Sequence, residues 1–237
     1  RIAATSAPIA SAIADRKRIA KSTSPATTGN ADEFGSSVAL QGDTIVVGAM
    51  HQDPAGVSIT NPPTRPGGAY VFTRSGETWM QTQVLKGSMS GGLIGDGFGT
   101  SVALFGDTLL VGAISDGTIG ALGGAVYVFR RTSSGWTEHQ KLTAAVRHDQ
   151  SLFGSSFEIS GDTLAIGAME DSAAVNRGGV VHVFRLRQDK WVEQQRIDPQ
   201  IKEGEFGFQL ALRGDTLLVS APHVMAPDFS AQPQGEI

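Results

Sequence analysis

The chain has 237 residues, and its hydrophobic content of 40% is enough for a packed core in one large domain or two small ones. Its formal net charge of −4 lacks the basic excess of a phosphate-binding surface, so we expect no nucleic-acid partner. The absence of cysteine excludes disulfides, thiolate metal ligands and cysteine nucleophiles, and no apolar run is long enough for a membrane span.

We treat residues 1–31 as an N-terminal extension and a candidate source of a closing strand. From residue 32 to residue 237 the chain consists of tandem repeats. Each repeat opens with Phe-Gly, has Gly-Asp-Thr eight residues after the Phe, and then an apolar run that ends in Gly-Ala or Ser-Ala. The four starts are Phe34, Phe98, Phe153 and Phe206.

The second half of the unit is repeated in the first three copies. A Gly-Gly pair precedes an apolar segment, and a Trp follows seven residues after the Phe of that segment. These segments are Tyr70-Val71-Phe72, Tyr127-Val128-Phe129 and His182-Val183-Phe184, followed by Trp79, Trp136 and Trp191. The fourth copy lacks this second half, because the chain reaches Ile237 where the next Gly-Gly segment would begin.

Each complete unit predicts four strands. In the first unit they cover Ser37–Leu40, Ile45–Ala49, Ala69–Thr73 and Trp79–Leu85. The second is a nearly continuous apolar run, so we expect both of its faces to be covered, and the fourth alternates as an outer strand does. Gly-Asp predicts a tight turn between the first two strands, and the glycines inside strands predict close packing of neighbouring sheets. Four strands in a unit of this size are typical of a β-propeller blade.

The Phe-Gly and Gly-Ala motifs resemble the FG-GAP repeat family, which includes the propeller heads of integrin α-subunits. Here Gly-Ala-Met, Gly-Ala-Ile, Gly-Ala-Met and Ser-Ala-Pro stand where the family has Gly-Ala-Pro. The resemblance covers about residues 32–237 and is closest to the bacterial form of the repeat. It implies an all-β propeller, usually extracellular, at the cell surface or in the periplasm, with a role in binding or adhesion.

One departure from the integrin form concerns calcium. The integrin loop supplies several carboxylates at alternate positions, as calcium requires, whereas each repeat here has a single one. We therefore interpret these aspartates as turn formers and expect no metal and no cofactor. They are Asp43, Asp107, Asp162 and Asp215.

Two arrangements would account for the incomplete fourth repeat. The repeats are part of a larger propeller of six to eight blades, or an N-terminal strand closes a small ring. Arg18–Lys21 resembles Gln140–Thr143, the end of an outer strand, which favours the second arrangement. Ala3–Ala14 is a poor copy of a third strand, and we favour the first.

No nucleophile elbow, phosphate loop or His-Glu-x-x-His motif is present, and we expect no catalytic residue and no enzyme activity. An acidic residue follows the Ala of each of the first three repeats by three or four positions, at Asp53, Asp116 and Asp171. In a propeller these positions meet on one face, so we name them, with the nearby His51, as ligand-binding candidates. Each Asp capping its own turn is the alternative. His182, in the Tyr70 and Tyr127 position, is expected to pack.

Three functions remain open from the sequence. The first is a non-catalytic binding or structural module that recognises a protein or glycan through its loops, with the proline-rich Met50–Pro66 as the main candidate. The second is an enzyme acting on polysaccharide, with the Asp53, Asp116 and Asp171 ring as its acidic site. The third is a subunit that assembles with another copy of itself through the incomplete blade.

Overall fold

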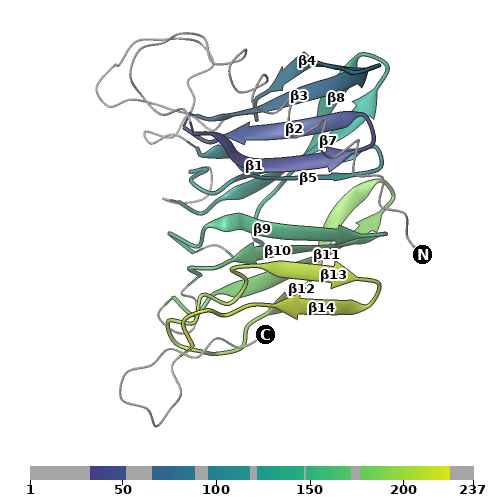
Figure 1. Cartoon of the computed structure of the whole chain (residues 1–237). Helices are drawn as coiled ribbons and strands as arrows, with labels where there is room; N and C mark the ends of the chain where they lie inside the picture. Colours follow the sequence, from purple (N-terminus) through teal and green to yellow (C-terminus); the bar gives the residue numbers. More distant parts are fainter. Residues whose placement is uncertain are drawn as a thin grey trace, which may run out of the picture.

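The computed structural model describes residues 33–51, 66–88, 96–117, 122–146, 148–171 and 177–224. All regular elements of these residues are strands, arranged in sheets that follow one another in chain order (Figure 1). Asp53, the extension 1–31, most of Met50–Pro66 and the end of the fourth repeat lie outside the described residues. Within the described part, no helix is long and apolar enough to cross a membrane.

Three sheets have four antiparallel strands each, and we call them blades 1 to 3. Blade 1 consists of β1 (Phe34–Gln41), β2 (Thr44–Ala49), β3 (Gly68–Ser75) and β4 (Thr78–Leu85). Blade 2 consists of β5 (Phe98–Phe105), β6 (Thr108–Ala113), β7 (Ala125–Thr132) and β8 (Gly135–Leu142). Blade 3 consists of β9 (Phe153–Ser160), β10 (Thr163–Ala168), β11 (Val180–Arg187) and β12 (Lys190–Ile197). The described part of blade 4 is the hairpin of β13 (Leu210–Arg213) and β14 (Thr216–Val219).

The predicted strands are confirmed, each extended by one or more residues. The first strand starts earlier than expected because the Phe of Phe-Gly pairs with the last Ala of the second strand, as Phe34 does with Ala49, before a register shift. Gly35 lies at the shift with φ of 97°, in the left-handed region that glycine enters at least cost. Burial of every residue of β2, β6 and β10 confirms the prediction that both faces of the second strand are covered.

The core is divided between the blade junctions. One cluster joins Val46 and Val71 of blade 1 to Leu109 and Phe129 of blade 2. An equivalent cluster joins Leu110 and Val128 of blade 2 to residues of blade 3. Successive residues Leu109 and Leu110 of β6 therefore face opposite neighbouring blades, which explains why this strand is apolar throughout.

Glycine in the second strand is required by the closeness of the next blade. A Cβ atom on Gly48 would collide with the carbonyl oxygen of Gly99. In the same way, a Cβ atom on Gly112 would collide with the carbonyl oxygen of Gly154, and one on Gly167 with that of Gly207. The predicted close packing is confirmed at these three positions, whereas blade 4 has Ser220 in the corresponding place.

Side-chain amides also tie the outer strands of neighbouring blades. Gln83 of β4 donates to the carbonyl of Trp136 at 2.7 Å and accepts from its N–H at 2.8 Å. Gln140 of β8 makes the same pair of bonds to Trp191, at 2.8 and 2.9 Å. Each of these amides satisfies both backbone groups of the tryptophan at the second position of the next outer strand, and we call this arrangement the glutamine clamp.

Candidate functional site

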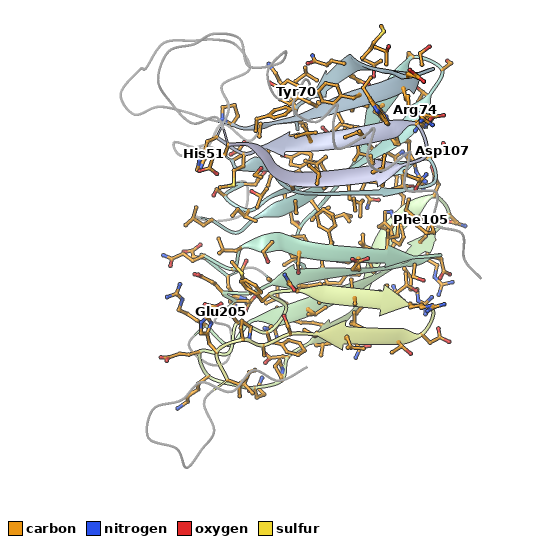
Figure 2. All side chains as sticks on the ribbon, viewed as in Figure 1. His51, Tyr70, Arg74, Phe105, Asp107 and Glu205 are labelled. Atoms are coloured by element: carbon orange, nitrogen blue, oxygen red, sulfur yellow. The ribbon has the colours of Figure 1, made fainter. Side chains whose placement is uncertain are left out.

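The blades have two distinct ends. The tight Gly-Asp turns lie at one end, here called the hairpin end, where Figure 2 shows Arg74, Phe105 and Asp107. The segments between second and third strands leave from the other end, here called the loop end, where the same view shows His51 and Glu205. By their sequence positions, the four ligand-binding candidates belong to the loop end.

Asp116 of blade 2 lies just after β6, with its side chain fully buried. Its Oδ2 accepts a hydrogen bond of 2.6 Å from the Tyr127 hydroxyl and lies 2.7 Å from Lys141 Nζ. Its backbone carbonyl accepts from Gly124 N–H at 3.2 Å, which closes the base of the loop between β6 and β7. Burial, followed by the hydrogen bond to Asp116, raises the pKa of the Tyr127 hydroxyl. The side chain of Asp116 therefore contacts β7 and β8, and its backbone closes the base of the loop.

A second carboxyl group is buried beside this cluster. Asp96, two residues before Phe98, is only 4% exposed, and its Oδ1 has no hydrogen-bond partner. Burial raises the pKa of Asp96, the Asp116 carboxylate raises it further, and Lys141 lowers it by a smaller effect. The blade 2 cluster thus contains two acids and one lysine in a largely dry environment.

Asp171 occupies the same place in blade 3 and is also fully buried. It lies 3.2 Å from both Arg196 Nη2 and His148 Nδ1, and Gly179 N–H donates to its carbonyl at 3.2 Å. Arg196 also pairs with Asp198 at 2.7 Å. Despite different partners, blades 2 and 3 both use this aspartate to close the loop.

His182 is fully buried and packs edge-on against Phe153, with ring centroids 5.2 Å apart, which confirms its predicted packing role. It also has a polar function, since its Nδ1 lies 2.7 Å from Glu193 Oε1. Burial would raise the pKa of Glu193, but the contacts with His182, the Ala145 N–H and Arg196 hold it below its ordinary value. Through its hydrogen bond from the Ala145 N–H, Glu193 contacts the segment that follows β8.

The two end blades carry matching surface pairs. His51 Nδ1 lies 3.0 Å from Glu33, and His223 Nδ1 lies 2.9 Å from Glu205. Both histidines follow the Ala of their repeat by two residues, and both glutamates directly precede Phe-Gly. In the described part of the chain, no group of three His, Cys, Asp or Glu side chains is arranged to hold a metal ion.

At the hairpin end the Gly-Asp pairs form turns, as predicted. The carboxylates of Asp43 and Asp162 pair with the arginines Arg74 at 2.7 Å and Arg185 at 2.6 Å. The hydrogen bond from Arg185 is the main reason that the pKa of Asp162 is lowered. These exposed pairs add little stability.

The structure places Asp116 and Asp171 at equivalent buried positions and His51 in a surface pair, whereas Asp53 is not described. A ligand role for these residues stays a prediction. Sequence reasoning missed Lys141 and Arg196, the cations that face the two aspartates. Lys141 and Arg196 both follow the Trp of their repeat by five residues. This shared spacing can be seen in the sequence, but only the strand register shows that the two cations face the aspartates.

The architecture defines a class of protein, namely a tandem-repeat protein built from propeller-type blades of four antiparallel strands. Models of the "FG-GAP repeat" match residues 25–72, 79–129 and 136–184, which together make up more than half of the chain. The chain belongs to the FG-GAP repeat family.

Other comparisons add little to this assignment. No curated protein matches the chain. Among solved structures, the chain is similar to a protein of Bacteroides uniformis provisionally named a 6-phosphogluconolactonase. The identity is 10%, the TM-score is 0.48, and the match covers 75% of this chain. It covers 46% of the other protein, so the chain spans less than half of that length.

Proposed function

We propose that the chain is a non-catalytic module that binds a protein or glycan partner through its loop end, outside the cell or in the periplasm. The observation that carries this proposal is the use of Asp116 and Asp171 as buried anchors for the loops that leave the blades. A rigid frame that displays loops of different sequence is the common arrangement of a recognition surface.

The charges of the anchors support a binding role over a catalytic one. Asp116 and Asp171 are neutralised by Lys141 and Arg196 and have no exposed side-chain surface. A general acid or base must come within hydrogen-bond distance of its substrate. Asp116→Asn tests the enzymatic alternative, because loss of turnover on a polysaccharide by a folded variant would contradict the proposal.

The binding role can be tested on the loop of blade 1. A variant in which two glycines replace residues 52–65 keeps the strands β2 and β3 and removes the proline-rich segment. Wild type and variant are compared on a panel of immobilised oligosaccharides and extracellular matrix proteins. We expect at least one member of the panel to bind wild type and to bind the variant at least tenfold more weakly.

A matched control changes a turn at the hairpin end. Replacing Gly76-Glu77, between β3 and β4, with Asn-Gly preserves a tight turn on the same blade. This control should bind like wild type. Equal loss in both variants, or no binding by wild type, would count against recognition at the loop end.

A further inference from the structure

The loops of blades 1 and 2 are each joined at their base to the blade that follows. Phe98 N–H, at the start of blade 2, donates to the carbonyl of Pro66 at the end of the blade 1 loop, at 2.9 Å. Phe153 N–H, at the start of blade 3, donates to the Gly123 carbonyl of the blade 2 loop at 3.3 Å. A parallel bridge lies beside each of these bonds. The two junctions therefore have the same backbone arrangement.

At the junction of blades 2 and 3, a serine hydroxyl adds a second bond to the loop carbonyl. Ser151 lies two residues before Phe153, is buried, and donates from Oγ to the Gly123 carbonyl at 2.8 Å. A carbonyl oxygen has two lone pairs, so it accepts from the amide and from the hydroxyl together. The hydroxyl thereby fastens the end of the blade 2 loop to the start of blade 3.

At the junction of blades 1 and 2, the residue in this position is Asp96, which is also buried. Its backbone carbonyl accepts from Ser115 N–H at 3.0 Å, as the Ser151 carbonyl accepts from Glu170 N–H at 3.4 Å. The two residues are thus equivalent in their backbone contacts, and Pro66 provides the corresponding loop carbonyl. A carboxylate has only acceptor oxygens, whereas a carboxylic acid has one O–H donor. Only the protonated form of Asp96 can therefore make the bond that Ser151 makes.

The charged groups around Asp96 come from three elements of blade 2. Burial raises the pKa of the Asp96 carboxyl group, the Asp116 carboxylate after β6 raises it further, and Lys141 of β8 lowers it by a smaller effect. From β7, the Tyr127 hydroxyl donates to Asp116 and is itself affected by the Asp96 charge. On the blade 1 side, the bonds across the junction are made by backbone groups, which carry no charge.

We propose that Asp96 is a pH-dependent latch between the base of the blade 1 loop and the start of blade 2. In the protonated state its carboxyl O–H donates to the Pro66 carbonyl, in the place of the Ser151 hydroxyl. When the proton leaves to solvent, this bond is lost and a negatively charged acceptor lies beside the carbonyl, which weakens the junction. The latch is closed below the ordinary pKa of 3.8 and opens as the pH rises through the raised pKa.

The latch would regulate the binding site proposed above. A loop whose base is already fixed loses less conformational entropy when a partner binds. A partner of the blade 1 loop should therefore bind more tightly in acid than at neutral pH. This consequence rests on the proposed function, whereas the latch itself is tested without a partner.

The test is amide hydrogen exchange of the intact chain, measured by NMR over a series of pH values. Rates are converted to protection factors, which removes the intrinsic effect of pH on exchange. We expect the protection factor of the Phe98 amide to fall about tenfold as the pH rises through the raised pKa of Asp96, because one hydrogen bond at the junction is lost. The Phe153 amide, at the serine junction, is the internal reference and should keep its protection.

Variants at the two equivalent positions exchange the property between the junctions. Asp96→Ser should protect the Phe98 amide equally at every pH, and Asp96→Ala should leave it weakly protected at every pH. Ser151→Asp should make the protection of the Phe153 amide fall with rising pH, and the two Asp96 variants provide the test if this one does not fold. The control Glu158→Gln removes another carboxyl group whose pKa is raised by burial, and it should leave the behaviour of the Phe98 amide unchanged.

Two results would overturn the latch. One is a protection factor of the Phe98 amide that is the same at every pH in the wild type. The other is a pH dependence that persists in Asp96→Ser, which would assign it to a different titrating group. A Phe98 amide that titrates as expected in a chain that binds no partner at any pH would support the latch and contradict the proposed function.

Discussion

Two buried aspartates of blade 2 differ in the groups that face them. Asp116 receives the Tyr127 hydroxyl and the Lys141 ammonium, whereas Asp96 Oδ1 is buried with no partner. A buried carboxylate without a full set of hydrogen bonds lowers the stability of the fold. A buried carboxylate that pairs with a cation stabilises the fold relative to a variant in which only the carboxylate is removed. Replacement of the two residues should therefore have opposite effects.

Asp96→Asn should stabilise the fold at pH 7 by about 1–3 kcal/mol, because the neutral amide avoids both the burial of a negative charge and the repulsion from the Asp116 carboxylate. Because the pKa of Asp96 is raised in the fold, its protonated form favours folding below the ordinary value of 3.8, and this contribution is lost as pH rises through the raised pKa. The advantage of the variant should thus grow with pH and vanish below pH 3.8. Thermal unfolding at a series of pH values measures it.

The comparison variant is Asp116→Asn, which removes the buried carboxylate charge that lies 2.7 Å from Lys141 Nζ. It should lose about 3–5 kcal/mol at pH 7, as expected when one member of a buried ion pair is removed. Equal effects of the two substitutions would contradict the distinction between the two carboxyl groups.

Glu193 has the opposite pH dependence. Its pKa is lowered in the fold, so its contribution is present above the ordinary value of 4.5 and is lost as pH falls through the lowered pKa. Glu193→Gln should lower stability at pH 7 by about 1–3 kcal/mol and flatten the acid limb of the stability profile. The exposed Glu203→Gln is the control, and a similar change in both variants would count against the role of the His182 contact.

At the scale of elements, the spacing between blades depends on glycine. Gly112→Ala places a Cβ against the Gly154 carbonyl and the Ser101 hydroxyl, and we expect a loss of about 1–3 kcal/mol or more. Gly106, in a hairpin turn, has open space around it and a φ of 57°. Gly106→Ala should cost only the left-handed backbone, about 1–2 kcal/mol. Urea unfolding of both variants gives the comparison, and a smaller loss for Gly112→Ala would refute close packing as the cause.

The strands could be predicted because they depend on local patterns that repeat. The turn at Gly42-Asp43, the apolar second strand and the close-packed Gly48 all follow from residue types at fixed spacing. The buried site could be predicted only in part. Asp116 meets Lys141 because Tyr127 and Lys141 are paired across β7 and β8, beyond a register shift after Val128. A register shift determines which side chains lie opposite each other, and no sequence motif in this chain predicts its position.

At the scale of the whole molecule, stability is shared between neighbouring blades. The two main clusters each join consecutive blades, so much of the core is shared between neighbours, as in other repeat proteins. We expect the amides of β6 and β10 to exchange hydrogen most slowly, because both faces and both edges of these strands are covered. Among the strands that the structure describes, β14, none of whose residues is buried, should exchange fastest. Mass-spectrometric hydrogen exchange checks this order, and equal protection of β6 and β14 would contradict it.

Ser220, in the place of the close-packed glycines, limits how the repeats of this chain could be rearranged. The repeats look alike, yet a new blade placed after blade 4 would bring its backbone onto a side chain where blades 1 to 3 offer none. The units are therefore not interchangeable parts. An artificial array made by copying blade 2 would keep the close spacing between neighbouring blades. An array that carried Ser220 in each copy would need a larger distance between its blades.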